Sequence, residues 1–467
     1  MSRTFYNKLL RSQRRLMNQR GVSVFLFGFC LVVMVPVIGL AVDVTLMYLA
    51  QTKLSAASDA AALAGARALS RGNNQTAQQQ SATDVATSYF YKNYPDGYLS
   101  TVSIAAPTIA IDTTASSRTV TVTSSIQFPL TFLRWLGPNS STSPLNASAV
   151  ATRKDVNVML VLDHSGSLSY SGSCEPMKSA ATAFLQQFAQ GRDNVGLASF
   201  ATGSLVDVPL NTTFRSGGTD IGAVISGINC ANSTNSSSGL WKAYDQLATL
   251  NKPDALNAIL FFTDGMPTAL TAWNHVSAPG CSANGWTKGS IADNRGLGNP
   301  NQGANEVQSI LPATGCSWTA SNWDTGDVSE VWNRDAFGNQ LDISYSAVTV
   351  SGGNIPNTSQ NMLAASINAT ISASQRIRSG TQILNWSPTT GATGSGPSLA
   401  GVAIYSIGLG NSGAPPDANL LMTVSNDPRG PNPDLNTAQG LYIFVSDATS
   451  LAPAFQRVAS ELLRLAR

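Results

Sequence analysis

Charged side chains are scarce in this chain. Across 467 residues Lys, Arg, Asp and Glu make up 12%, well below the ~25% of an average soluble protein. The net charge is only +2, which gives no support for nucleic-acid binding. A polar surface with so few charges is typical of secreted and cell-surface proteins.

Several motifs of enzymes and zinc proteins are also absent from the sequence. There is no CxxC pair, and the only histidines are His164 and His275, so a zinc site is disfavoured. Neither the GxxxxGK[ST] phosphate loop nor the GxSxG turn of α/β-hydrolases occurs. His164 lies between Asp163 and Ser165, but adjacent residues rarely face one another, so a hydrolase triad is disfavoured. We expect no enzymatic activity and no small-molecule substrate.

The N-terminus combines a basic segment with a long apolar run. Residues 1–20 hold six basic side chains and no acidic one, and residues 21–42 carry no charge. About 20 apolar residues cross a membrane, and Lys and Arg stay on the cytoplasmic side. We therefore expect a single-pass helix in the inner membrane, with the bulk of the chain periplasmic or extracellular. The alternative is a cleaved signal peptide, whose apolar region is shorter, at ~7–15 residues.

Residues 43–153 predict an extended helix followed by a small β region. Alanine and leucine favour helix as far as about Arg71, and a second helix is expected before a turn at 93–97. Alternating patterns at 100–112 and 118–128 indicate strands. The piece PLTFLRWLG is short and amphipathic, and it precedes a further strand candidate.

Residues 154–467 alternate between apolar strands and helices. This pattern predicts a doubly wound α/β domain, in which helices cover both faces of a mostly parallel sheet. The alternation lapses at about 266–360, which is too long for an ordinary connection and indicates an inserted subdomain. Residues 387–398, rich in Gly, Ser and Thr, predict a flexible loop.

Three loops at the expected carboxyl edge of this sheet carry oxygen ligands. Asp163, Ser165 and Ser167 follow the first strand, Thr234 precedes a helix, and Asp264 ends another strand. Functional groups gather at this edge of a parallel sheet. Hydroxyl and carboxylate oxygens suit a hard divalent cation, Mg²⁺ or else Mn²⁺ or Ca²⁺. One such loop could be a helix cap, but three at the same edge favour a metal.

These loops resemble the metal-ion-dependent adhesion site of the von Willebrand factor A domain. The stretches LVLDHSGSLS and FFTDG carry the resemblance, together with the Thr234 loop. The resemblance implies three direct hydroxyl ligands and two aspartates that act largely through water. The implied direct ligands are Ser165, Ser167 and Thr234, and the supporting aspartates are Asp163 and Asp264.

Thr219 is a rival for the threonine ligand. It lies in Gly217-Gly218-Thr219-Asp220, which is similar to the family's Gly-Gly-Thr loop. We prefer Thr234 because a long helix follows it and Asp264 lies about thirty residues downstream.

The N-terminal run resembles the TadE/TadG-like segment of tight-adherence (Flp) pilus-assembly proteins. Arg20-Gly21 before the apolar run, Asp43 just beyond it and DAAALAGA at 59–66 carry this resemblance. TadG-like proteins join such an anchor to an extracytoplasmic von Willebrand A domain. Substrates of prepilin peptidase carry Glu at the fifth position after the cleaved glycine. That position is Leu26 here, so we expect the anchor to stay intact.

Together the two resemblances imply a membrane-anchored periplasmic protein that assists pilus assembly or anchoring. Its partner would be another pilus-assembly protein or a carboxylate-bearing protein ligand, bound through the metal. Two alternatives stay open: a surface or released adhesin that binds a host or matrix ligand, and a structural anchor with a vestigial site.

The cysteines fit an oxidising compartment. Cys30 lies in the apolar run, which leaves four others, and an even number there predicts two disulfides. Residue spacing leaves three pairings open. Because Cys174 and Cys230 fall in loops expected at the metal edge, we prefer Cys174–Cys230 with Cys281–Cys316.

Overall fold

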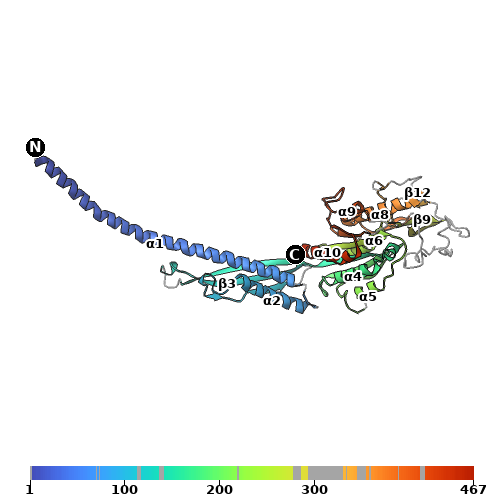
Figure 1. Cartoon of the computed structure of the whole chain (residues 1–467), viewed down its shortest axis with the longest axis horizontal. Helices are drawn as coiled ribbons and strands as arrows, with labels where there is room; N and C mark the ends of the chain where they lie inside the picture. The colour runs from blue at the N-terminus through green and yellow to red at the C-terminus, as the bar shows by residue number, and fades with distance from the viewer. Residues whose placement is uncertain are drawn as a thin grey trace. The chain divides into compact units, whose positions relative to one another are not determined.

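The computed structural model describes the chain in two compact units (Figure 1). The first comprises residues 1–69, 79–112 and 119–152, and the second residues 70–78, 113–118 and 153–467. The description covers residues 3–466 except residues 70, 73, 113–116, 136–140, 218–219, 277–284, 293–329, 333, 344–345, 347–353, 357–358, 388 and 411–415. Thr219, Cys281 and Cys316 therefore lie outside the described residues.

The first unit is built on one long helix, α1 (Arg3–Ala68). Its part from Ser23 onward contains a stretch with a mean hydropathy of 2.7, long and apolar enough to cross a membrane. Pro36 lies inside this helix, and the chain continues through it without a break. The expected apolar N-terminal helix is confirmed, and so is its continuation beyond the apolar run.

Helix α2 (Gln75–Asn93) and a small sheet cover the outer half of α1. Alanines on both helices make the contact close, and a Cβ added at Gly65 would lie 3.1 Å from that of Ala86. Strand β3 alternates buried and partly exposed positions, so its inward side chains complete this core. Strand β3 spans Ser117–Pro129 and pairs with each of the three other strands of the sheet. These are β1 (Ser103–Ile104), β2 (Thr108–Asp112) and β4 (Thr142–Lys154).

The second unit is centred on a six-stranded sheet of order β16-β15-β8-β5-β6-β7. All neighbours pair in parallel except β6 and β7, which are antiparallel. The strands are β5 (Val156–Asp163), β6 (Asn194–Phe200), β7 (Ser204–Asn211), β8 (Leu256–Thr263), β15 (Ala403–Leu409) and β16 (Tyr442–Val445). Every residue of β5 is buried, as expected of a central strand covered on both faces.

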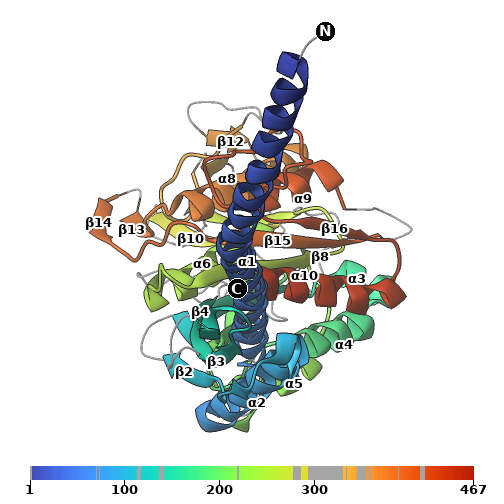
Figure 2. The same ribbon diagram turned by 90° about the vertical axis from the view of Figure 1, so that its left-hand side faces the viewer.

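Helices cover both faces of this sheet, so the predicted doubly wound α/β fold is confirmed. Figure 2 shows α8 and α9 on one side of β15 and β8, with α4 and α10 on the other. One core contains side chains of α4 (Cys174–Leu185), α5 (Ile221–Ser226) and α10 (Leu451–Leu465). The other contains those of α6 (Ser236–Leu250), α8 (Ser359–Ser379) and α9 (Ala418–Ser425).

Between β8 and α8 the chain forms a separate antiparallel sheet of order β10-β9-β11-β12. Its strands are β9 (Ala269–Val276), β10 (Gly285–Ala292), β11 (Glu330–Trp332) and β12 (Asn354–Pro356). This sheet occupies part of the expected insertion.

The expectation of a flexible loop at 387–398 is wrong for half of its length, Ser387 and residues 391–395. Strands β13 (Leu384–Ser387) and β14 (Gly391–Ser395) pair there as an antiparallel hairpin. Exposure explains the error, because β14 has no buried residue and so lacks the apolar alternation by which a strand is recognised.

Candidate functional site

Strand β5 ends at Asp163, a buried carboxylate held on both of its oxygens. Its Oδ1 accepts a hydrogen bond of 2.8 Å from the Ser165 amide, and its Oδ2 accepts one of 2.5 Å from the Thr263 hydroxyl. Thr263 is the last residue of β8, the parallel neighbour of β5. The two strand ends are thereby tied together at the carboxyl edge of the sheet.

Side-chain oxygens of Ser165, Ser167 and Asp264 form a hydrogen-bonded chain next to the Asp163–Thr263 pair. Ser165 Oγ lies 3.1 Å from Ser167 Oγ, and Ser167 Oγ donates a bond of 2.5 Å to Asp264 Oδ1. Ser165 occupies the N-cap of the short helix α3 (Gly166–Tyr170), but its hydroxyl makes no capping bond. The helix-cap alternative therefore does not account for Ser165.

The loop that carries Thr234 meets these residues through its backbone. We call Asp163–Ser167 loop 1, Asn232–Thr234 loop 2 and Asp264–Thr268 loop 3. The amide of Gly166 donates to Asn232 O at 2.9 Å, which joins loops 1 and 2. The amide of Thr234 donates to Thr268 Oγ1 at 3.0 Å, and Thr234 O accepts from the Thr268 amide at 2.9 Å. The structure thus joins Ser165 to Asp163 and to Ser167, and Ser167 to Asp264, by hydrogen bonds. It connects the backbone of Thr234 to loop 3.

The arrangement fits a small divalent cation. Adjacent oxygens of an octahedral Mg²⁺ shell with bonds near 2.05 Å lie about 2.9 Å apart, close to the 3.1 Å between the two serine hydroxyls. Burial raises the pKa of Asp163 to about 6, although hydrogen bonds from Ser165 and Thr263 lower it. A nearby cation would offset this burial penalty by favouring the charged carboxylate. Among the described residues no three His, Cys, Asp or Glu side chains form a metal-binding group.

Three further contacts hold loop 2 in place. Cys174, at the start of α4, forms a disulfide with Cys230, so this part of the predicted pairing is confirmed. His164 Nδ1 lies 2.9 Å from Asn229 O, and the Ala231 amide donates to His164 O at 2.8 Å. Burial lowers the pKa of His164, which keeps its ring neutral at pH 7. The segment that leads into Thr234 is therefore fixed to the residue that follows Asp163.

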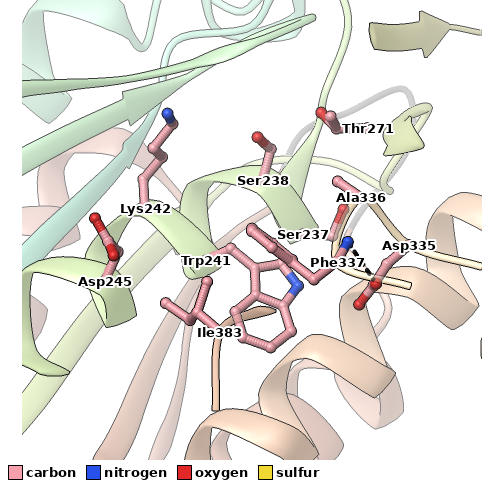
Figure 3. Close-up of a pocket in the computed structure, with 10 residues that line it drawn as sticks. All are labelled: Ser237, Ser238, Trp241, Lys242, Asp245, Thr271, Asp335, Ala336, Phe337 and Ile383. Atoms are coloured by element: carbon pink, nitrogen blue, oxygen red, sulfur yellow. Dashed lines mark hydrogen bonds between the residues drawn. The ribbon is translucent and has the colours of Figure 1, made fainter. Parts of the chain in front are cut away.

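Helix α6, which begins directly after loop 2, also lines a cavity of about 180 Å³ (Figure 3). Trp241 of α6 packs against Phe337 of the inserted segment, with ring centroids 4.9 Å apart. Asp335 holds the turn that carries Phe337, because its Oδ1 accepts the Phe337 amide at 2.9 Å. The described part of the insertion thus rests on the helix that starts at loop 2.

Comparison with protein families matches two parts of the chain. Residues 21–68 match the family "Putative Flp pilus-assembly TadE/G-like", and residues 158–266 match the "von Willebrand factor type A domain". The chain joins a TadE/G-like segment to a von Willebrand factor type A domain. The second match spans loops 1 and 2 and the start of loop 3. Both predicted resemblances are confirmed.

No curated protein sequence matches the chain, whereas solved structures do at low identity. The pilus adhesin SpaC of Lactobacillus rhamnosus GG is 12% identical (TM-score 0.35), over 77% of this chain and 34% of its own. The chain thus spans about a third of that adhesin. The PilB minor pilin of Streptococcus sanguinis is 13% identical (TM-score 0.35), over 77% of this chain and 78% of its own. The von Willebrand domain of the type V pili tip protein Mfa5 from Porphyromonas gingivalis is 13% identical (TM-score 0.37), over 68% of this chain and 98% of its own.

Two residues of the site escaped the sequence analysis. Thr263 and Thr268 supply the hydroxyls that hold Asp163 and Thr234. Thr263 stood in the quoted FFTDG stretch and could have been proposed from its place beside Asp264. Nothing in the sequence marks Thr268, because its role depends on a contact with a residue 34 positions away.

Proposed function

We propose that this protein is anchored in the inner membrane by α1 and binds a protein partner through a divalent cation held by its A domain. The bound partner would be another pilus-assembly protein, and the contact would serve assembly or anchoring of a tight-adherence pilus. The convergence of loops 1, 2 and 3 at one sheet edge carries the proposal for binding. The TadE/G-like segment supports the pilus context.

The hydroxyls of Ser165, Ser167 and Thr234 would hold the ion directly. Asp163 and Asp264 would accept hydrogen bonds from its water ligands and balance part of its charge. Mg²⁺ suits this set best, and Mn²⁺ or Ca²⁺ are alternatives. A cation with so few anionic ligands supplies an electron-poor site that an Asp or Glu of the partner completes. This role is binding rather than catalysis.

Calorimetry on the full chain in detergent tests the site. We expect saturable Mg²⁺ or Mn²⁺ binding that Ser165→Ala and Thr234→Ala each weaken at least tenfold. Ser169→Ala is the matched control, since Ser169 is an exposed serine of the same short helix α3. Binding that survives both site variants would reject the ligand set. Binding that Ser165→Ala weakens but Thr234→Ala does not would point to Thr219 as the threonine ligand.

A second experiment tests the partner. In cells that make the pilus, Ser165→Ala should reduce both surface pili and the recovery of pilus-assembly proteins cross-linked to the chain. Ser169→Ala should change neither. Normal piliation in Ser165→Ala cells would favour the structural-anchor alternative, whereas normal piliation with lost adhesion to a host or matrix surface would favour the adhesin.

A further inference from the structure

The apolar part of α1 is exposed on all sides except at two positions. From Ser23 to Thr45 every residue is exposed apart from Gly39 and Asp43, which are buried. These two residues are four apart, so they lie on one face of the helix, one turn from each other. Another segment of the first unit therefore packs on this face of α1 and on no other face of its apolar part from Ser23 to Thr45.

The cover is the segment Thr131–Leu133, which leads from β3 into the 3-10 helix η2 (Leu133–Trp135). The Asp43 carboxylate accepts three backbone hydrogen bonds, from the amides of Thr131 at 3.1 Å, Phe132 at 2.8 Å and Leu133 at 2.7 Å. A Cβ added at Gly39 would lie 2.7 Å from both Cβ and Cγ of Phe132. The aspartate therefore binds the segment, and the glycine makes room for it.

This contact falls at the end of the membrane run. An α-helix rises 1.5 Å per residue, so Gly39 lies about 6 Å deeper than Asp43. The hydrocarbon core takes about 20 residues, and counting from Gly21 these end near residue 40. Phe132 packs on Gly39 and so lies at the outer limit of the hydrocarbon core. Its side chain is nevertheless 43% exposed, beside the exposed lipid-facing positions of α1.

We propose that Thr131–Trp135 is a second membrane contact, an interfacial anchor inserted into the outer boundary of the lipid bilayer beside α1. The proposal rests on the proposed membrane span of α1. Its occupant is lipid, because the uncovered side of Phe132 continues the apolar surface of the span. The sequence Phe-Leu-Arg-Trp has the aromatic and basic residues that gather at membrane interfaces. Asp43 fixes the depth of this anchor through its three hydrogen bonds.

Site-specific photo-crosslinking in the full chain tests the anchor. A benzophenone amino acid is introduced at position 132, at 31 inside the apolar run, or at 80 on the exposed side of α2, in membranes that contain labelled phospholipid. We expect lipid adducts at 132 with at least half the yield at 31, and at least ten times the yield at 80. Lipid at 31 but not at 132 would overturn the proposal, as would an adduct between position 132 and a second protein. Absence of lipid at 31 would instead contradict the membrane span itself.

Two glycines provide a matched pair of variants for the same measurement. Gly39→Leu should push the segment away from α1 and lower the lipid adduct at 132 at least threefold. Gly28→Leu should leave it unchanged, because nothing lies within 4 Å of a Cβ at Gly28. Hydrogen exchange adds a second readout: Asp43→Ala should speed exchange of the Phe132 and Leu133 amides at least tenfold. Equal adduct yields in the two glycine variants would contradict the proposed contact.

Discussion

Ser167 Oγ donates a hydrogen bond of 2.5 Å to Asp264 Oδ1, although the two residues are 97 positions apart in the chain. Ser167 follows β5 and Asp264 follows β8, so parallel pairing of these strands brings the two loops together. This bond fixes the hydroxyl and the carboxylate relative to each other, although they belong to different loops.

Thr268 should control cation affinity without touching the ion. Thr268→Val removes the oxygen that accepts the Thr234 amide, while Val keeps the side-chain volume. A typical hydrogen bond contributes about 1 kcal/mol, so the Kd for Mg²⁺ should rise about fivefold in titration calorimetry. Thr423→Val is the control, because Thr423 bonds only within α9 in the described contacts, to Asn419 O at 2.8 Å. An unchanged Kd in Thr268→Val would show that the Thr268 hydroxyl does not position Thr234.

The disulfide should stabilise both the fold and the site. Replacing Cys174 and Cys230 by serine opens a link between residues 56 apart, and the free energy of unfolding should fall by about 2–5 kcal/mol. Loop 2 begins two residues after Cys230, so Mg²⁺ affinity should fall as well. Urea unfolding and calorimetry on the double variant measure the two effects. A stability loss with an unchanged Kd would mean that the bonds of Gly166 and His164 position loop 2 by themselves.

Gly239 allows α6 to pack closely on the sheet. A Cβ there would lie 2.7 Å from Phe200 Cδ1 and 3.1 Å from Val161 Cγ1, and both side chains belong to the buried core. Gly239→Ala should therefore lower the free energy of unfolding by about 1–3 kcal/mol, measured by urea titration. Gly227→Ala is the matched control, since its nearest contact would be 3.5 Å away. Equal free energies of unfolding for the two variants would show that α6 moves away from the sheet to fit the new Cβ without losing stability.

Asp427 should make stability depend on acid pH. Hydrogen bonds from Arg429 and from the Tyr442 amide lower the pKa of this buried carboxyl to about 2, against the desolvation that raises it. The depressed pKa stabilises the fold above the unfolded pKa near 4, and this contribution disappears as pH falls from about 4 to 2. The shift corresponds to about 2 kcal/mol.

Urea unfolding of wild type and Asp427→Asn isolates this effect. At pH 6 the free energy of unfolding of the wild type should exceed that of the variant by most of the ~2 kcal/mol that the pKa shift predicts. The difference should shrink as the pH falls toward 2. A difference that stays constant between these pH values would assign the loss in Asp427→Asn to packing rather than to charge.

The site was predictable because its chemistry lies in short sequence stretches. Asp163, Ser165 and Ser167 occur within five residues after an apolar strand, and Asp264 ends another such strand. Parallel pairing then places both stretches at one sheet edge. The role of Asp43 could not be derived in this way, since the amides it binds lie 88–90 positions further along.

The sequence analysis missed elements that are short or exposed. Helix α9 spans only Ala418–Ser425, too few residues for a helical period to emerge. Asp417 was an available signal, because its carboxylate caps α9 by accepting the amides of Asn419 and Leu420. Strand β14 gave no apolar alternation because none of its residues is buried.

Strand β5 has a mechanical consequence. The chain from the anchor enters β5 at Val156, and loop 1 leaves it at Asp163. Under the proposed function, a partner that pulls on loop 3 would load the end of β8 at Thr263, and the tension would leave the sheet along β5. Its hydrogen bonds to β6 and β8 lie across that direction and are loaded in shear, so they must break together rather than one after another. Parallel pairing of β5 with β8 would then carry load from a bound partner to the chain that precedes Val156.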